Sequence, residues 1–228
     1  RDTAVSLSGA VVEDMEDSFE WVWKMAKAGK RFSRAWKRLS GAADFSFVTN
    51  SPSFRQRYIY RALLTAIRSA KQYIYLTTPY FIPNHTLFDA FKAAHRRGVD
   101  IRLIVTKNSD HHFVDLASRS YFTPAMRAGV RVFRFKNRIL HAKAAVIDGI
   151  WASVGSANLD NLSLLLNYEG NIVTTNPRFA ADVKTQFLED MEFMATVQGS
   201  DVSGLHKQIF GNVDGPSYKQ FFESRVNQ

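Results

Sequence analysis

Residues 141–158 read HAKAAVIDGIWASVGSAN. The run places a histidine and a lysine two positions apart, followed by apolar residues, an Asp-Gly pair and a Gly-Ser-x-Asn segment. Side chains at i and i+2 of a β-strand project from the same face, so His141 and Lys143 can converge on one anion. An imidazole that attacks or transfers a proton, beside an ammonium that neutralises charge, suits the chemistry of a phosphate group.

The Asp-Gly pair in this run is typical of a tight hairpin turn. We expect Asp148 and Gly149 to join a strand at 141–147 to a strand at 151–154. Asp148 is counted among the candidate catalytic residues because it belongs to the motif. The frequency of aspartate in such turns nevertheless favours a structural role for it.

Hydrophobic periodicity along the rest of the chain predicts alternating strands and helices. Helices are expected at 55–71, 85–97, 112–128 and 179–196, and strands at 73–78, 99–105, 130–135, 141–147, 151–154 and 168–175. Pro124 is expected to bend or split the third helix, and Gly98 to end the second. Alternation of this kind implies an α/β fold with helices on both faces of the sheet, and the hairpin makes that sheet mixed.

The motif H-x-K-x4-D-x6-G-S-x-N resembles the signature of the phospholipase D superfamily. The following stretch, NLDNLSLLLNYE, resembles the continuation of that signature, although Leu162 stands where many members carry arginine. The resemblance implies a phospholipase D-like fold, a mixed sheet sandwiched between helices. It also implies that the chain is one motif-bearing half of a pseudo-two-fold, two-lobed enzyme.

The same resemblance implies a role for each motif residue. His141 would be the nucleophile that forms a phosphohistidine, or the acid–base partner of a histidine in an opposite motif. Lys143 would bind the non-bridging phosphoryl oxygens, and Glu169 would hydrogen-bond the far ring nitrogen of the histidine. Ser156 and Asn158 would supply neutral donors to the substrate phosphate or to the loop.

A second motif is expected from the resemblance but does not occur in this chain. Residues 50–195 resemble the segment around the second motif of bacterial cardiolipin synthases, and the opening RDTAVSLSGAVVEDMEDSF resembles the stretch after their first motif. The chain is therefore interpreted as a C-terminal half. Its expected partner is an N-terminal half with its own motif, or a homodimer mate related by a two-fold axis.

Charge is concentrated near the N-terminus. The formal net charge is +9, and residues 21–39 contain seven lysines or arginines, several aromatic residues and no acid. A solvated basic helix and a membrane-interface segment are both compatible with this pattern. The candidate interface residues are Trp21, Trp23, Lys24, Lys27, Arg31, Trp36 and Lys37. They would place the protein peripherally on the cytoplasmic face of a bacterial inner membrane, bound to its anionic surface.

Composition predicts a folded unit without cofactors. The chain has no cysteine, which excludes disulfides and thiolate metal sites, and its histidines form no HExxH arrangement. We therefore expect no metal and no cofactor. Residues 1–49 are interpreted as a linker or strand followed by a basic-aromatic helical segment, 50–197 as the catalytic half and 198–228 as a tail.

Three functions are compatible with the sequence. The first is phosphatidyl transfer or phospholipid hydrolysis through a phosphohistidine, as in a cardiolipin synthase. The second is a metal-independent DNA or RNA phosphodiesterase of the same superfamily, since a nucleic-acid surface would also be basic and aromatic. The third is a non-catalytic half that binds a membrane or a partner, which the intact His141, Lys143, Asn158 and Glu169 disfavour.

Overall fold

The computed structural model of this chain describes residues 1–27, 44–50, 57–107, 112–135, 139–160, 163–164, 167–192 and 194–196. Helices and strands alternate along most of it. In chain order they are α1 (Ala10–Lys27), β1 (Phe45–Asn50), α2 (Tyr58–Ser69), β2 (Tyr73–Thr77), β3 (Phe81–Ile82), α3 (His85–Arg96), β4 (Asp100–Thr106), α4 (His112–Ser120), α5 (Phe122–Arg127), β5 (Val130–Phe135), β6 (Ala144–Ile147), β7 (Trp151–Gly155), β8 (Leu159–Asp160), β9 (Glu169–Thr174), α7 (Pro177–Met191) and β10 (Met194–Thr196).

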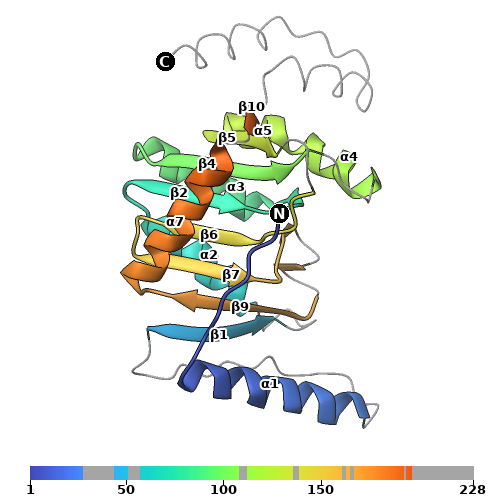
Figure 1. The fold of residues 1–228 in the computed structure, drawn as a ribbon. Helices are drawn as coiled ribbons and strands as arrows, with labels where there is room; N and C mark the ends of the chain where they lie inside the picture. The colour runs from blue at the N-terminus through green and yellow to red at the C-terminus, as the bar shows by residue number, and fades with distance from the viewer. Residues whose placement is uncertain are drawn as a thin grey trace, which may run out of the picture.

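One large mixed sheet organises the described residues (Figure 1). Its eight strands run in the order β1-β9-β7-β6-β2-β4-β5-β10. The pairs β2–β4 and β4–β5 are parallel, whereas the other pairs are antiparallel. The short strands β3 and β8 form a separate parallel pair. The predicted α/β fold with a mixed sheet is confirmed.

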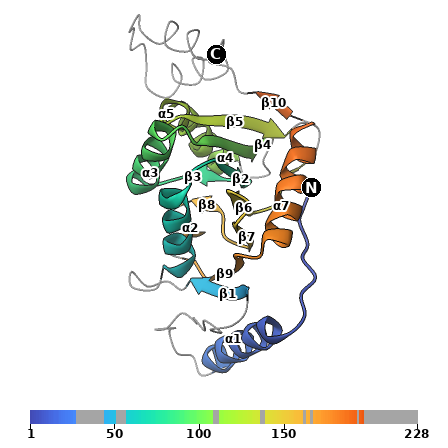
Figure 2. The same ribbon diagram turned by 90° about the vertical axis from the view of Figure 1, so that its left-hand side faces the viewer.

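Helices cover both faces of the sheet (Figure 2). On one face α2 and α3 enclose the larger apolar core, in which Ile67, Leu76 and Phe91 are fully buried. On the other face α7 covers a smaller core in which Phe187 stacks on Tyr75, with ring centroids 4.7 Å apart. Strand β2 lies between the two cores and all five of its residues are buried, as expected for a strand covered on both faces.

Caps and proline set the helix ends. Asn84 and Asn176 accept backbone N–H groups at the starts of α3 and α7, and Gly98, with a positive φ, follows α3. The predicted helix 112–128 is two helices that meet at Tyr121, just before Pro124. The predicted helix 179–196 was too long, because α7 ends at Met191 and the chain then enters β10, which pairs with β5.

The motif hairpin starts later than predicted. Strand β6 begins at Ala144, so His141 and Lys143 lie in the extended segment that leads into it. The N-terminal segment of the chain lies beside this position: the carbonyl of Arg1 accepts the backbone N–H of His141 at 2.8 Å. From there the segment crosses the sheet to α1, which lies next to β1 (Figure 1). Strand β1 is the edge strand of the sheet.

Candidate active site

The ring of His141 faces a carboxylate from the start of the chain. Its Nδ1 lies 3.3 Å from Oδ2 of Asp2, and both side chains are mostly exposed, by 63% and 68%. Partial burial raises the pKa of Asp2, but the Thr3 N–H, His141 and Lys143 outweigh it, so the pKa is lower than usual. A carboxylate held at Nδ1 fixes the ring tautomer and leaves Nε2 as the nitrogen available for attack or proton transfer.

Lys143 is the buried cation of the site. The residue is 8% exposed, and its Nζ donates to the carbonyl oxygen of His141. Burial lowers the pKa of Lys143, while the charges of Asp2 and Glu169 oppose that change. The ammonium is therefore near both carboxylates and next to the histidine backbone, and its burial strengthens its attraction for an incoming anion.

Glu169 contacts a serine rather than the histidine. The hydroxyl of Ser156 donates to Oε2 of Glu169, and the backbone N–H of Gly170 donates to that hydroxyl at 3.0 Å. These contacts join the end of β7 to the start of β9. Among the described residues, the carboxylate at the ring of His141 comes from Asp2, and Glu169 makes no hydrogen bond to that ring.

Asn158 lies on the loop that follows β7. Its Nδ2 donates to the hydroxyl of Ser163 at 3.4 Å. Its Oδ1 is buried and lacks a hydrogen-bond partner within the part of the chain that the structure describes. Buried polar atoms normally have a hydrogen-bond partner, so this amide oxygen can still accept a hydrogen bond from a donor group of a ligand.

Asp148 lies at the opposite end of β6 from His141. Its carboxylate accepts the backbone N–H groups of Lys71, Gln72 and Tyr73, at 2.7, 2.9 and 2.8 Å. Its φ of 54° places it in the left-handed region that a tight turn requires. The geometry ties the motif turn to the start of β2 and keeps Asp148 away from the other four motif side chains.

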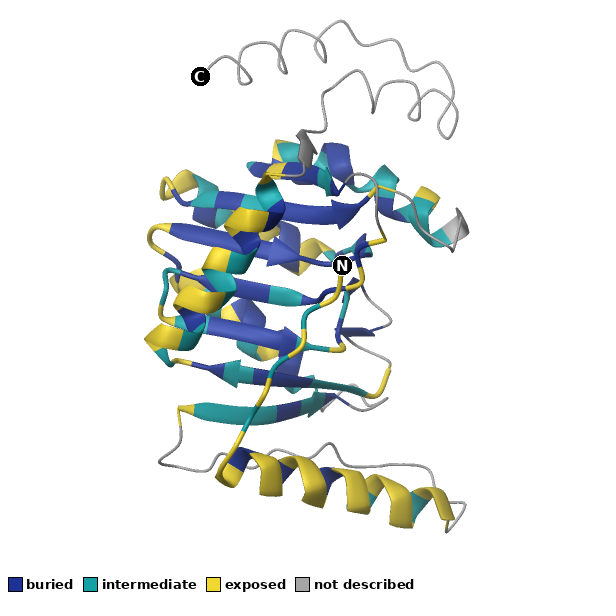
Figure 3. Ribbon diagram, viewed as in Figure 1, coloured by how far each residue is buried: buried dark blue, intermediate teal, exposed yellow. Residues whose placement is uncertain are grey.

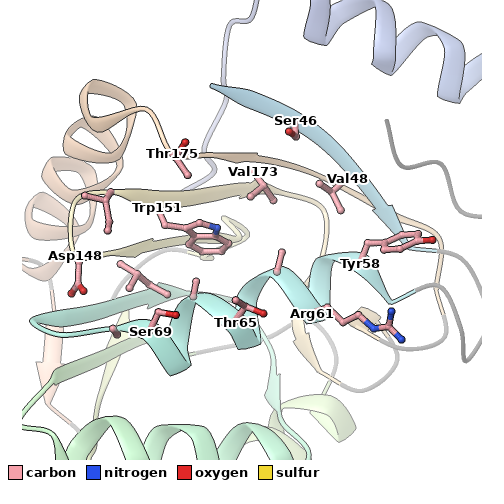
Figure 4. Close-up of a pocket in the computed structure, with 15 residues that line it drawn as sticks. Ser46, Val48, Tyr58, Arg61, Thr65, Ser69, Asp148, Trp151, Val173 and Thr175 are labelled. Carbon is pink, nitrogen blue, oxygen red and sulfur yellow. The ribbon is translucent and has the colours of Figure 1, made fainter. Parts of the chain in front are cut away.

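A pocket also lies at this opposite end. It measures about 570 Å³ and lies between α2 and the strands β1, β7 and β9. Figure 4 shows Tyr58 and Arg61 at one end of the pocket, Asp148 at the other end and Trp151 between them. His141 and Lys143 do not line it, so the pocket and the motif site are separate features of the fold.

Only some of the candidate membrane-interface residues lie within the described ranges. Trp21, Trp23, Lys24 and Lys27 lie on α1, whereas Arg31, Trp36 and Lys37 are outside the described residues. Trp23 is 54% exposed, and the Nζ of Lys27 lies 5.4 Å from the centroid of its ring. Lys24 pairs with Glu20 at 2.7 Å.

Each helix in the described ranges is too short or too polar to cross a lipid bilayer.

Across those ranges, the histidine and carboxylate side chains do not gather into a group of three that could hold a metal ion.

A family model matches this arrangement of motif and fold. The model described as "Cardiolipin synthase, PLD-like domain" covers residues 63–191, more than half of the chain and all of the motif. The chain belongs to the phospholipase D-like family. The resemblance inferred from residues 141–169 is thereby confirmed.

Sequence relatives agree with this membership. Cardiolipin synthase A of Pseudomonas putida is 34% identical over 209 residues, which are 91% of this chain and 43% of the relative. The chain therefore spans less than half the length of the curated relatives that it matches.

Solved structures share the fold. The phospholipase D family member Nuc of Salmonella typhimurium superposes with a TM-score of 0.55 and 22% identity, over 67% of this chain and 98% of that one. Phosphatidylserine synthase of Haemophilus influenzae gives a TM-score of 0.58 and 12% identity, over 98% of this chain and 54% of that one.

Asp2 is the site residue that the sequence prediction missed. The resemblance places the stretch that contains it after a first motif, but it implies no role for this carboxylate. A signal was present: Asp2 precedes an extended segment and then a helix, in the same order as Glu169, β9 and α7.

Proposed function

We propose that this chain is one motif-bearing half of a phospholipase D-type enzyme that transfers a phosphatidyl group, as a cardiolipin synthase does. The observation that carries the proposal is the convergence of His141, Lys143 and Asp2 at the start of β6, in a chain 34% identical to cardiolipin synthase A. The site offers a ring nitrogen oriented by a carboxylate and a buried ammonium for a phosphoryl oxygen.

The proposed reaction has two displacements. In the first, the unprotonated ring nitrogen of one motif histidine attacks the phosphorus of a phospholipid. The P–O bond to the head-group alcohol breaks, and the histidine of the other motif protonates the leaving oxygen. In the second, an acceptor hydroxyl gives its proton to that second histidine and attacks the phosphorus, and the P–N bond breaks. The acceptor is the glycerol hydroxyl of another phospholipid, or water in the hydrolytic variant.

Within this scheme His141 is the nucleophile or the proton donor, and Asp2 holds its Nδ1 in either role. Lys143 binds a non-bridging oxygen, where its charge offsets the negative charge that develops in each transition state. Asn158 contributes a neutral amide donor, and the hydroxyl of Ser156 holds Glu169 beside the site. The second histidine comes from another motif-bearing half, because this chain contains one H-x-K motif and spans 43% of its relative.

The substrate class is tested by parallel incubation of the two-half enzyme with vesicles of phosphatidylglycerol, vesicles of phosphatidylethanolamine and single-stranded DNA. We expect a new phospholipid product from vesicles, formed equally well in the presence of a chelator because Lys143 supplies the positive charge. Cleavage of the DNA alone would overturn the proposal in favour of a nucleic-acid phosphodiesterase.

The role of the motif is tested with the His141→Ala variant of the same enzyme. We expect turnover to fall by roughly 10³-fold or more, because removing one member of a group of catalytic residues that act together costs about as much as removing all of them. The matched control is His85→Ala, which removes an exposed histidine at the start of α3. Turnover that survives His141→Ala would remove this histidine from the mechanism.

The proposed location follows from the proposed substrate. An enzyme that acts on phospholipids works at a membrane surface, and the net charge of +9 favours an anionic one. We therefore propose peripheral association with the cytoplasmic face of a bacterial inner membrane. Co-sedimentation with anionic and zwitterionic vesicles measures this association, and equal binding to both would contradict the electrostatic component.

A further inference from the structure

Helix α1 exposes an apolar stripe. Val12, Met15, Phe19, Val22 and Trp23 recur every three or four residues, and Phe19 and Trp23 are 66% and 54% exposed. The rings of these last two residues stack with centroids 6.0 Å apart. Figure 3 shows α1 as mostly exposed along its length. Large aromatic side chains gathered on one exposed face indicate a surface that binds another protein surface or a membrane.

The contacts that α1 makes within the chain use a different face. Val11, Asp14 and Ser18 are the residues that it buries, and the neighbouring element is β1. These three are offset from the apolar stripe around the helix, so the contact with β1 leaves the stripe between 37% and 66% exposed.

Helix α7 shows what such a stripe does in this fold. Its residues Ala180, Val183, Phe187 and Met191 lie against the sheet in the smaller core. Ala180 is fully buried and Phe187 is 3% exposed, stacked on Tyr75 of β2. The helix thereby closes the sheet face opposite α2 and α3 (Figure 2).

The two helices carry the same pattern. The spacing from Val12 through Met15 and Phe19 to Trp23 equals the spacing from Ala180 through Val183 and Phe187 to Met191. The segments before them also correspond. Asp2 stands as far before the first residue of α1 as Glu169 stands before the first residue of α7, and extended chain connects each pair. Counted from these carboxylates, the stripe of α1 begins one residue earlier than that of α7.

We infer that α1 is the covering helix of a second motif-bearing half, and that its apolar stripe packs on the open sheet face of that half as α7 packs here. The inference rests on the two-half enzyme proposed above and assigns the surface that joins the halves. Residues 1–27 thus span both halves. Asp2 lies at the histidine of this half, and Phe19 takes the place on the other sheet that Phe187 takes on this one.

A second copy of this chain does not fit as the occupant. Its equivalent sheet face is already closed by its own α7, in which Ala180 and Phe187 are almost wholly buried. The half that receives α1 must have a sheet that lacks its covering helix. A half that precedes Asp2 in the same polypeptide meets this requirement, because α1 then follows it along the chain.

An anionic lipid surface fits α1 less well than a protein sheet. The helix carries five carboxylate residues, Glu13, Asp14, Glu16, Asp17 and Glu20, against two lysines, Lys24 and Lys27. An interfacial helix on anionic lipid normally carries cations on its polar face. Here the polar face beside the stripe is mainly acidic.

The absence of cysteine from the sequence allows a direct test. Phe19→Cys places a unique thiol on the stripe, and the matched control Glu13→Cys places one on the exposed polar face. Maleimide labelling rates are compared for the chain alone, for the chain with phosphatidylglycerol vesicles, and for the chain extended upstream to include the first motif-bearing half. In the extended enzyme we expect the rate at position 19 to fall at least about tenfold relative to the chain alone, with little change at position 13.

A second measurement avoids the loss of the Phe19 ring. Hydroxyl-radical oxidation of the unsubstituted chain reports on Met15 and Trp23, and we expect both to be protected in the extended enzyme only. A rate at position 19 that stays high in an extended enzyme that turns over substrate would overturn the inference and leave the proposed function standing. Protection by vesicles alone, or protection that grows with the concentration of the isolated chain, would also overturn it, in favour of lipid or a second copy. Protection in an extended enzyme without turnover would support the inference while the proposed function fails.

Discussion

At the scale of single residues, the burial of Lys143 determines the pH range in which its amine carries a positive charge. Burial lowers the pKa of its amine although Asp2 and Glu169 oppose the change. An amine loses its charge as the pH rises through its pKa, so Lys143 becomes neutral at a lower pH than an ordinary lysine, whose pKa is about 10.4. We predict that kcat/KM of the two-half enzyme falls on the alkaline side with an apparent pKa below that value.

The control for this prediction is Lys143→Arg, whose guanidinium stays charged. In Lys143→Arg, the fall of kcat/KM at alkaline pH is expected to move to higher pH or to disappear. The bulkier arginine side chain can also lower the maximal kcat/KM, but this does not affect the position of the fall. An alkaline limb that is unchanged in Lys143→Arg would assign the titration to another group.

Asp2 gives a second prediction at this scale. Its carboxylate lies 3.3 Å from Nδ1 of His141, so Asp2→Asn removes the charge that orients and stabilises the protonated ring. We predict a loss of roughly 10²–10⁴-fold in kcat with a smaller change in KM, because a positioning residue acts mainly in the transition state. Steady-state kinetics measure the changes in kcat and in KM separately. Asp2→Glu should recover part of kcat.

The comparison for Asp2 is Asp89→Asn, which removes an exposed carboxylate of α3 that pairs with Lys92 at 3.6 Å. Its kinetics should match those of the unsubstituted enzyme. If Asp2→Asn raised KM without lowering kcat, Asp2 would be a substrate-binding group and not the support of the histidine.

At the scale of elements, Asp148 joins the motif hairpin to β2. Its carboxylate accepts three backbone N–H groups from residues 71–73. Asp148→Ala removes all three acceptors, and we predict a loss of about 1–3 kcal/mol in the free energy of unfolding. Activity per folded molecule should change little, since the carboxylate lies at the far end of β6 from His141. Denaturant unfolding and turnover measure the two effects separately.

Asp148→Asn is a milder substitution at the same position and serves as the comparison for Asp148→Ala. It keeps Oδ1, which accepts from Gln72 and Tyr73, and loses the acceptor for Lys71. Its stability should lie between those of the alanine variant and the unsubstituted chain. A large loss of turnover in stably folded Asp148→Asn would instead make this residue part of the chemistry.

Gly155 allows β7 and β9 to approach each other at the site. A Cβ added there would lie 2.3 Å from the carbonyl oxygen of Gly170 and 2.5 Å from Cα of Asn171, so backbone would have to move. We predict that Gly155→Ala lowers the free energy of unfolding by about 2–3 kcal/mol. Gly98→Ala is the comparison: it meets nothing within 4 Å but adopts a positive φ, which costs about 1 kcal/mol. Equal losses in the two variants would show that β7 and β9 adjust to the added methyl group.

Local signals explain which elements could be predicted. The Asp148-Gly149 turn, the proline in 112–128 and the apolar strand 130–135 are specified by neighbouring residues, and each lies where the sequence placed it. The end of α7 was misplaced because its apolar pattern continues into residues 194–196, where pairing with β5 overrides helix propensity.

The candidate site was predicted less completely because its contacts are distant in sequence. His141 and Lys143 are two residues apart, and their nearness follows from the extended backbone that leads into β6. Asp2 lies 139 residues from His141, so the residues around either one do not indicate their contact; only the repeated order of carboxylate, extended segment and helix singles out Asp2. The three N–H groups bound by Asp148 are likewise remote, at residues 71–73, so its structural partners could not be identified from the turn itself.

At the scale of the whole molecule, one motif cannot complete the proposed reaction, which needs two histidines. The chain alone contributes His141, and the sheet face of a second copy is already closed by α7. We therefore predict that the isolated chain shows no more than background phosphatidyl transfer, and that its specific activity does not rise with its own concentration. Adding the first motif-bearing half upstream should restore turnover by roughly 10³-fold or more. Activity assays across a dilution series, with sedimentation to measure association, test this directly. Specific activity that rises with concentration together with dimer formation would show instead that two copies of this half build the site.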